Sequence, residues 1–169
     1  GRIGKAVARY AEAFGVKVVW WGSEDGRARA IADGQTVANS RAEFFANSDF
    51  VSLHLRLTAM SRGIITAEDL GMMKPTASLI NTSRAGLIAE GALLDALNAG
   101  RPSRAGIDVF EKEPLTDPDD PLVHHPGVTA TPHIGYVTED ELDMQFADIY
   151  DQINAFVAGE PIHLVNKLS

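Results

Sequence analysis

The sequence predicts an α/β protein built on a doubly wound parallel sheet. Short apolar runs rich in β-branched and aromatic residues alternate along the chain with segments of helical periodicity. Strands that alternate with helices pair in parallel through right-handed crossovers, and the helices cover the faces of the sheet. The chain has 169 residues, of which 45% are hydrophobic, so it is long enough for one domain with a sizeable core.

Each expected element follows from the spacing of its apolar residues and from the residues at its ends. The first helix stops at Gly15, and a later helix has Thr66 as its N-cap with Asp69 as the capping-box partner. Helical spacing predicts helices over residues 2–14, 41–46, 66–73, 90–99 and 138–157. Short apolar runs predict strands over residues 16–21, 50–55, 78–81, 105–109 and 128–130.

Composition and charge argue against several classes of partner. The net charge of −8 repels phosphate backbones, so nucleic acid is not expected as a partner. No apolar run approaches the roughly 18 residues that a membrane span needs. The chain has no cysteine, which excludes disulfides and thiolate metal sites. We therefore expect a cytoplasmic protein that binds neither a membrane nor a metal.

The chain opens with Gly1, Arg2, Ile3 and Gly4, directly followed by a helix, which is the second half of a G-x-G-x-x-G motif. Gly1 would let the backbone approach a pyrophosphate, and Gly4 would let the helix pack close to the sheet. The helix N-terminus offers free N–H groups to the phosphates. A loop glycine before any helix would look the same, but the strand–helix context favours a Rossmann-type sheet that lacks its first strand.

The end of the second strand, where an acid often binds the ribose hydroxyls of NAD, carries Gly22 instead. Glu24 and Asp25 follow and would favour NAD, whereas Arg27 and Arg29 could accept the 2′-phosphate of NADP. We expect NAD as the cofactor, with NADP as the alternative. A solvated polar turn would explain the same residues.

Four motifs resemble the D-isomer-specific 2-hydroxyacid dehydrogenase family. Three of them are NTSRAG at residues 81–86, GIDVFEKEP at residues 106–114 and TPHIG at residues 131–135. The segment SLHLRLT at residues 52–58, followed closely by SRG, resembles the cofactor loop of the family. The motifs follow predicted strands in this order, and the resemblance covers essentially the whole chain.

The resemblance implies that Arg84 grips the substrate carboxylate, that His133 is the acid/base, and that Glu113 orients the histidine. These residue types suit the chemistry, because reduction of a 2-oxo acid needs a hydride at the carbonyl carbon and a proton at its oxygen. A histidine exchanges protons near neutral pH, and a carboxylate beside it favours the imidazolium. The planar fork of an arginine suits a carboxylate. The implied cofactor contacts are Gly1, Arg2, Ile3, Leu57, Thr82, Asp108, His133 and Gly135.

Taken singly, these residues have ordinary explanations. A histidine after a proline is usually a turn or core residue, an arginine after Asn-Thr-Ser could cap a turn, and an acid before a proline is usually solvated. Together, in intact motifs, they favour the catalytic interpretation. His124 and His125 lie in the proline-rich loop of residues 113–126 and are expected to be solvated, and His54 is expected to be structural.

The chain departs from the family pattern at a few positions. Arg56 stands where a proline is common and Ala85 where a glycine is common. The first change would alter the cofactor loop, whereas the second is mild. Gly22 in place of the usual acid leaves the choice between NAD and NADP open.

The resemblance also implies how the chain is organised. Residues 1–134 would form the dinucleotide-binding domain, and residues 135–169 would form a C-terminal helix and tail that pack on a substrate domain preceding Gly1. The expected function is interconversion of a D-2-hydroxy acid and its 2-oxo acid by hydride transfer, with NAD(P) as cofactor. The full-length protein would be a homodimer, and the present fragment alone would be inactive.

Two other functions on the same fold remain open. A formate-type dehydrogenase moves no proton with the hydride and has glutamine beside the histidine, so Glu113 disfavours it. A non-enzymatic NAD-sensing regulatory module could retain Arg84, Glu113 and His133, and only turnover separates it from an enzyme. The residues do not identify the 2-hydroxy acid, because the loops expected to read its side chain precede Gly1.

Overall fold

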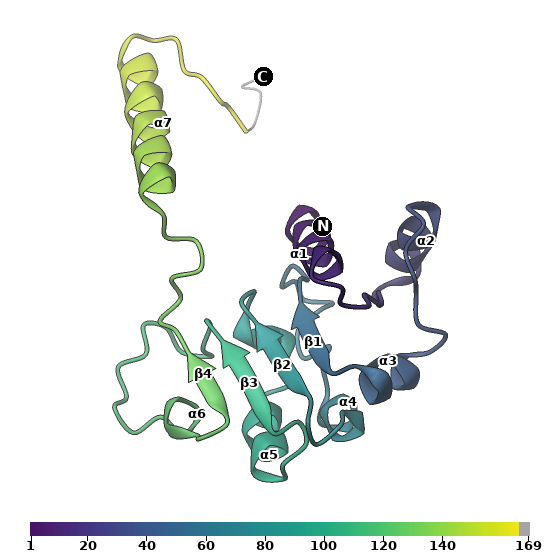
Figure 1. Cartoon of the computed structure of the whole chain (residues 1–169). Helices are drawn as coiled ribbons and strands as arrows, with labels where there is room; N and C mark the ends of the chain where they lie inside the picture. Colours follow the sequence, from purple (N-terminus) through teal and green to yellow (C-terminus); the bar gives the residue numbers. More distant parts are fainter. Residues whose placement is uncertain (166–169) are drawn as a thin grey trace. The chain divides into compact units, whose positions relative to one another are not determined.

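The computed structural model describes residues 1–165, in which strands and helices alternate as an α/β chain (Figure 1). Two compact units are present, one spanning Gly1–His133 and the other running from Ile134 onward. The first unit holds the sheet and the helices around it. The second unit holds one long helix, and each unit is described here by itself.

The sheet has four strands in the order β1-β2-β3-β4, and every neighbouring pair is parallel. Asn81 at the end of β2 pairs with Leu53 at the end of β1 and with Ile107 at the end of β3, so these strands end at a common edge. The parallel α/β architecture predicted from the sequence is therefore confirmed. The strands are β1 (Phe50–Leu53), β2 (Ser78–Asn81), β3 (Arg104–Ile107) and β4 (Val128–Ala130).

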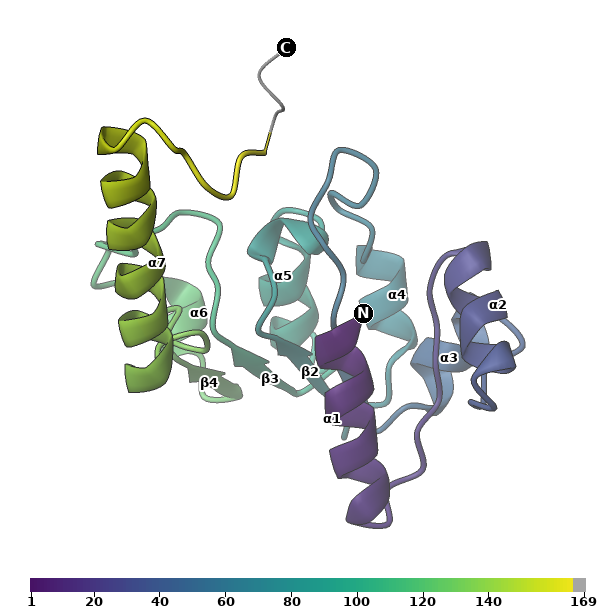
Figure 2. The same ribbon diagram turned by 90° about the horizontal axis from the view of Figure 1, so that it is seen from above.

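Helices flank the strands on both sides, with α4 and α5 along one face of the sheet and α1 on the other (Figure 2). Four of them lie close to the ranges predicted by helical periodicity, residues 2–14, 41–46, 66–73 and 90–99, and two others were not predicted. The capping box of Thr66 and Asp69 is present at the start of α4. The helices of this unit are α1 (Arg2–Ala13), α2 (Glu24–Ala32), α3 (Arg41–Asn47), α4 (Ala67–Met72), α5 (Ala92–Asn98) and α6 (Pro121–His124), with a 3₁₀ turn η1 (Ala85–Leu87).

The hydrophobic core lies where α4 and α5 cover the sheet. Val51, Leu79 and Ile107 contribute one buried side chain from each of β1, β2 and β3, and Leu70 and Leu97 meet them from the helices. Each such side chain stabilises the fold by roughly 1.5–3 kcal/mol when it leaves water. This packing fixes the ends of the strands, and therefore the loops that follow them.

The predicted strand over residues 16–21 is wrong. Only an isolated bridge forms there, between Trp20 and Val37, and Val16 and Val19 are 49% and 42% exposed. Extended backbone becomes a strand only when a neighbour accepts and donates its hydrogen bonds. Among the described residues, no strand lies beside this segment to do so, although its composition suits one.

The segment read as a polar turn after Gly22 is instead helix α2, which begins after Ser23. The Ser23 hydroxyl accepts a hydrogen bond from the backbone N–H of Gly26, as an N-cap does. Acidic residues in its first turn suit the positive end of the helix dipole. Its hydrophobic periodicity is weak, which explains why the sequence pattern did not predict it.

The second unit is dominated by α7 (Glu139–Val157), which begins at the N-cap Thr138 and ends before Gly159, where φ is +77°. This confirms the long C-terminal helix predicted from the sequence. Its apolar residues at helical spacing stay exposed, with Phe146 at 54% and Phe156 at 74%. In the described part of the chain, no helix is long and apolar enough to cross a membrane.

Candidate active site

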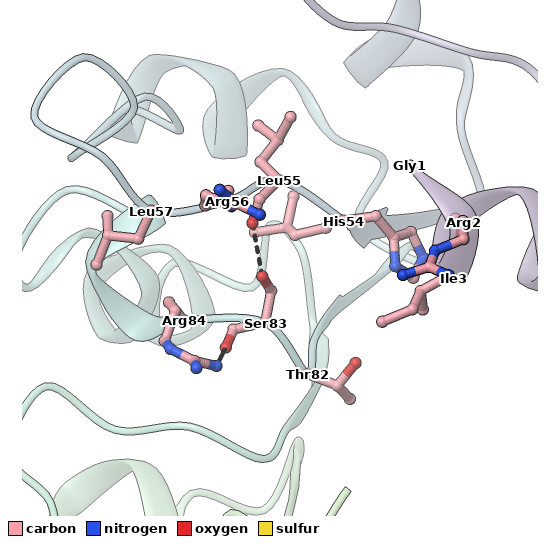
Figure 3. A pocket seen from close by; sticks show the side chains of 12 residues that line it. Gly1, Arg2, Ile3, His54, Leu55, Arg56, Leu57, Thr82, Ser83 and Arg84 are labelled. Atoms are coloured by element: carbon pink, nitrogen blue, oxygen red, sulfur yellow. Dashed lines mark hydrogen bonds between the residues drawn. The ribbon is translucent and has the colours of Figure 1, made fainter. Parts of the chain in front are cut away.

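A pocket of about 550 Å³ lies beside the N-terminus of α1, where β1 and β2 end (Figure 3). The N–H groups in the first turn of α1 have no helical carbonyl to donate to, so they can bind a ligand. The chain contributes three segments to the wall of this pocket. They are residues 1–4 at the start of α1, residues 53–57 in the loop after β1, and residues 82–84 in the turn after β2.

The close approach of α1 to the sheet depends on Gly4. A Cβ atom at this position would lie 3.2 Å from Cβ of His54, which is tighter than side chains normally pack. The prediction that Gly4 lets the helix pack closely is therefore confirmed. A larger residue would push the N-terminus of α1 away from the pocket.

His54 forms part of the pocket wall, with its ring beside Arg2 and Ile3 (Figure 3). Its Nε2 atom lies 3.0 Å from the Ser52 hydroxyl oxygen. Burial lowers the pKa of His54. The ring therefore stays neutral near pH 7 and serves as a packed wall, consistent with the structural role expected for it.

The turn that carries Arg84 is held by Asn81, the last residue of β2. The Asn81 side chain is buried; its amide nitrogen donates to the carbonyl of Arg84 at 3.0 Å, and its amide oxygen accepts from the N–H of Ser83 at 3.1 Å. The Arg84 guanidinium in turn donates from Nη1 to the carbonyl of Ser83 at 2.6 Å. The local fold therefore holds the arginine at the edge of the pocket.

His133 and Glu113 form a direct pair, although 20 residues separate them. His133 Nδ1 and Glu113 Oε2 are 2.6 Å apart, and the two side chains are 30% and 33% exposed. The other carboxylate oxygen, Oε1, accepts from the backbone N–H of Phe110 at 2.8 Å. The carboxylate is thus fixed at both oxygens, and Nε2 of the imidazole points away from it.

The charges of the site favour an ionised Glu113. Partial burial alone would raise the pKa of this carboxyl group. The hydrogen bond from the N–H of Phe110, the hydrogen bond and charge of His133, and the charge of Arg84 outweigh burial, so the pKa of Glu113 is lowered. Arg84 and His133 therefore both favour the ionised carboxylate of Glu113.

Asp108 follows β3 and is buried, with 3% of its surface exposed. Its carboxylate accepts a hydrogen bond from the Thr131 hydroxyl at 2.5 Å. Thr131 lies two residues before His133, so this contact ties the end of β3 to the segment that carries the histidine. Asp108 therefore helps to hold the segment that carries His133 in position.

The structure brings most of the predicted site residues to the ends of neighbouring strands. The pocket beside α1 contains Gly1, Arg2, Ile3, Leu57, Thr82 and Arg84. His133 pairs with Glu113, and Asp108 pairs with Thr131. Gly135 belongs to the second unit. Five further lining residues were not predicted as site residues, although each lies within the SLHLRLT or the NTSRAG motif; they are Leu53, His54, Leu55, Arg56 and Ser83.

The two histidines of the proline-rich loop are engaged in local contacts. His124 Nε2 lies 2.6 Å from the carbonyl oxygen of Pro118, and His125 Nδ1 accepts from the N–H of Gly127 at 3.0 Å. His124 is exposed as expected, but His125 is half-buried and stabilises its turn. Within residues 1–165, no group of three histidines or acids is arranged to hold a metal ion.

Comparison with known proteins agrees with this geometry. Residues 1–135 match the family described as D-isomer specific 2-hydroxyacid dehydrogenase, NAD binding domain. The chain is 38% identical over 160 residues to D-3-phosphoglycerate dehydrogenase of Mycobacterium tuberculosis, covering 95% of this chain and 30% of that protein. It is 36% identical over 171 residues to glyoxylate reductase of Thermococcus litoralis, covering 99% of this chain and 50% of that protein.

A crystal structure of an oxidoreductase from Ralstonia solanacearum superposes with a TM-score of 0.93 at 44% identity, covering 98% of this chain and 48% of that one. The chain thus spans half or less of the length of these relatives. The similarity includes the whole sheet and the loops that carry the pocket. The chain belongs to the D-isomer specific 2-hydroxyacid dehydrogenase family and comprises its NAD-binding domain.

Proposed function

We propose that the protein is an oxidoreductase that interconverts a D-2-hydroxy acid and its 2-oxo acid with a nicotinamide dinucleotide. The observation that carries this proposal is the contact of 2.6 Å between His133 Nδ1 and Glu113 Oε2, with the charge of Arg84 acting on the same carboxylate. A histidine, its orienting carboxylate and a carboxylate-binding arginine are the groups that such a reaction needs.

The pocket beside α1 suits the dinucleotide. No atom lies within 4 Å of a Cβ built on Gly1, so the backbone there is open to a pyrophosphate. We assign Gly1, Arg2 and Ile3 to the phosphates, and Leu57 and Thr82 to the wall around the nucleotide. Asp108, His133 and Gly135 are proposed to lie near the nicotinamide, which supplies or accepts the hydride when the cofactor is bound.

We expect NAD, and NADP is the alternative. The two arginines after Gly22 would favour the 2′-phosphate of NADP, but Arg27 is already engaged within the protein. Its guanidinium donates to the carbonyl of Gly22 at 2.7 Å and lies 4.5 Å from the centre of the Trp21 ring. Glu24 and Asp25, exposed at the start of α2, are available for the ribose hydroxyls.

In the direction of reduction, a proton must reach the carbonyl oxygen as a hydride reaches the carbonyl carbon. His133 would donate this proton from Nε2, because Nδ1 faces Glu113. Glu113 holds the ring through the contact at Nδ1, and Arg84 binds the carboxylate of the substrate through two parallel hydrogen bonds. In the reverse direction, neutral His133 takes the proton of the hydroxyl group.

The alternative is a regulatory module that senses NAD without turnover. It would keep the dinucleotide pocket and could retain Arg84, Glu113 and His133 without using them. A formate-type reaction moves no proton and is disfavoured by Glu113. Turnover is therefore what separates an acid/base enzyme from the regulatory module.

We further propose that the full-length protein is a homodimer of the cytoplasm. The exposed apolar side chains of α1 and its C-cap, with Ile3 at 74%, Tyr10 at 69% and the C-cap Phe14 at 86%, need a cover in the complete protein. A chain without cysteine suits a reducing compartment. Light scattering at micromolar concentration tests the dimer, and a monomer would contradict it.

The experiment that tests the function is an assay of the full-length protein with a panel of 2-oxo acids and with NADH and NADPH. Oxidation of the reduced cofactor by at least one 2-oxo acid, lost in Arg84→Ala through a raised KM, supports the proposal. Tight binding of NADH without turnover of any 2-oxo acid would instead support the regulatory module.

A further inference from the structure

Ser83 joins two segments of the pocket wall, the loop after β1 and the turn after β2 (Figure 3). Its hydroxyl donates to the carbonyl oxygen of Leu55 at 2.7 Å, across 28 residues of sequence. Its own carbonyl accepts from Nη1 of Arg84 at 2.6 Å, and its N–H donates to the side chain of Asn81. A continuous chain of hydrogen bonds therefore runs from the loop after β1 to the guanidinium of Arg84.

The two loops also pack against each other through the backbone. The N–H of Gly63 donates to the carbonyl of Gly86 at 2.8 Å. A Cβ at Gly86 would lie 2.9 Å from Nη1 of Arg62 and 3.2 Å from Cδ2 of Leu57, so the loops touch closely there. Among the residues that the structure describes, Ser83 supplies the only side-chain hydrogen bond that crosses between residues 54–63 and residues 82–87.

Under the proposed function, the hydrogen bond from Ser83 to Leu55 joins two loops that contact different ligands. The Leu55 side faces the dinucleotide pocket, which residues 53–57 line. The Arg84 side faces the carboxylate of the substrate. A cofactor that fills the pocket holds the loop after β1 in place, and the Ser83 hydroxyl passes that restraint to the turn that carries Arg84.

We propose that Ser83 is a positioning residue that couples occupancy of the dinucleotide pocket to the affinity of Arg84 for the substrate carboxylate. This inference rests on the proposed function. With the cofactor bound, the Leu55 carbonyl is fixed, the Ser83 turn is ordered, and the guanidinium is oriented for a two-point contact. Without the cofactor, the loop is less restrained, and the same arginine binds a carboxylate more weakly.

Linkage gives this proposal a measurable form. The factor by which the cofactor raises affinity for a carboxylate equals the factor by which the carboxylate raises affinity for the cofactor. A hydrogen bond of this kind contributes a net free energy that corresponds to about threefold to tenfold in an equilibrium constant. Loss of the Ser83 hydroxyl should therefore lower the coupling factor by that amount.

The test uses the full-length protein and oxamate, an unreactive analogue of a 2-oxo acid. Calorimetry gives the dissociation constant of oxamate with and without saturating NADH, for the wild type, Ser83→Ala and Ser83→Thr. Ser48→Ala is the matched control, because its hydroxyl also donates to a backbone carbonyl, that of Phe44 at 2.6 Å, but at the end of α3.

We expect Ser83→Ala to lower the coupling factor, whereas Ser83→Thr, which retains a hydroxyl, and Ser48→Ala keep it. Steady-state rates of Ser83→Ala should show a raised KM for the oxo acid with little change in kcat. An active Ser83→Ala enzyme with the wild-type coupling factor would overturn the proposed role of Ser83 but not the proposed function. The same holds if Ser83→Ala and Ser83→Thr lower the coupling factor equally. Absence of both turnover and oxamate binding in the wild type would overturn the proposed function as well.

Discussion

At the scale of single residues, Glu113 is the group whose environment most constrains the chemistry. Contacts with Phe110 and His133 and the charge of Arg84 lower its pKa against the opposing effect of burial. A carboxyl group whose pKa is below its usual value of about 4.3 is fully ionised at neutral pH. His133 therefore faces a fixed negative charge throughout the pH range in which a dehydrogenase works.

This charge predicts the effect of Glu113→Gln on the pH dependence of the full-length enzyme. Glutamine keeps the shape of the side chain but removes the negative charge that Nδ1 of His133 faces at 2.6 Å, which weakens the histidine as a proton donor. Reduction needs imidazolium, and its rate should therefore fail at lower pH than in the wild type. Steady-state rates in both directions across pH measure the shift. An unchanged profile would mean that Glu113 does not act through the histidine.

Cofactor affinity is the internal control for this variant. Glu113 contacts His133 and the backbone of Phe110 and is absent from the lining of the pocket beside α1. The dissociation constant of NADH should therefore stay within about twofold of the wild-type value, since only an interaction outside the dinucleotide site is removed. A large loss of cofactor affinity would show that the substitution had disturbed the fold of the site.

The resemblance to the family implied Arg84, Glu113 and His133 as a group, and each of them follows a strand of a parallel sheet, whose strands end together. Ser83 and His54 could not be given their places in this way. Their contacts with Leu55 and Gly4 join segments 28 and 50 residues apart, and those distances depend on how two loops pack. No pattern within either segment encodes that packing.

At the scale of elements, the start of α4 is held to α3 by a buried ion pair. Asp69 is 2% exposed, and both of its carboxylate oxygens accept from Arg41 at 2.6 Å. Burial alone would raise the pKa of Asp69, but hydrogen bonds from Arg41 and from Thr66 outweigh it and lower the pKa. Because the folded pKa is the lower one, this contribution to stability is present at neutral pH and is lost as pH falls through it.

Arg41→Ala should therefore destabilise the protein at pH 7 by about 2 kcal/mol, because it leaves a buried carboxylate unpaired. This is less than the 3–5 kcal/mol of a fully buried pair, since Arg41 is 39% exposed. The difference from the wild type should shrink as the pH falls below about 3.9, the usual pKa of an aspartate, toward the lowered pKa of folded Asp69. Urea unfolding at several pH values measures this effect.

The exposed pair of Lys74 and Asp49 provides the matched control. Its Nζ–Oδ1 distance is 2.7 Å, but the side chains are 37% and 70% exposed. Lys74→Ala should cost less than about 1 kcal/mol at any pH, as exposed pairs usually do. If Arg41→Ala and Lys74→Ala lower the free energy of unfolding equally, burial does not make the pair of Arg41 and Asp69 the more stabilising one.

The sequence predicted helix ends correctly where capping residues mark them locally. It failed where a strand forms only if a neighbouring strand supplies hydrogen bonds. The capping box of Thr66 and Asp69 and the stop at Gly15 are local, and both are confirmed. Residues 16–21 have strand composition, but only Trp20 finds a bridge partner, so no strand forms. Helix α2 forms with little amphipathic pattern and is stabilised by its Ser23 cap.

At the scale of the whole molecule, large apolar surfaces remain uncovered in both units. Phe14, which follows α1 as its C-cap, is 86% exposed, and in the other unit Ile153 and Val157 of α7 are 50% and 81% exposed. Since the chain spans half or less of its relatives, these faces suit contact with further protein in a complete enzyme. A pocket without such cover cannot exclude water from the reaction.

Residues 1–169 alone should therefore show negligible dehydrogenase activity. Misplaced or solvated reacting groups lose rate factors of about 10² or more, so turnover should be at least that much lower than in the full-length protein. The two proteins are compared at equal concentration with the best 2-oxo acid and cofactor. Comparable turnover would show that the site is complete within this chain.

The most direct measurement of the central claim compares His133→Ala with His124→Ala in the full-length enzyme. His124 is an exposed histidine at the end of α6 whose ring, among the described residues, has a hydrogen bond only with the carbonyl of Pro118, so its loss should leave the rate nearly unchanged. Loss of a positioned general acid should lower kcat for reduction of a 2-oxo acid by about 10²–10⁴-fold in His133→Ala. A His133→Ala enzyme as fast as His124→Ala would contradict the assignment of the acid/base.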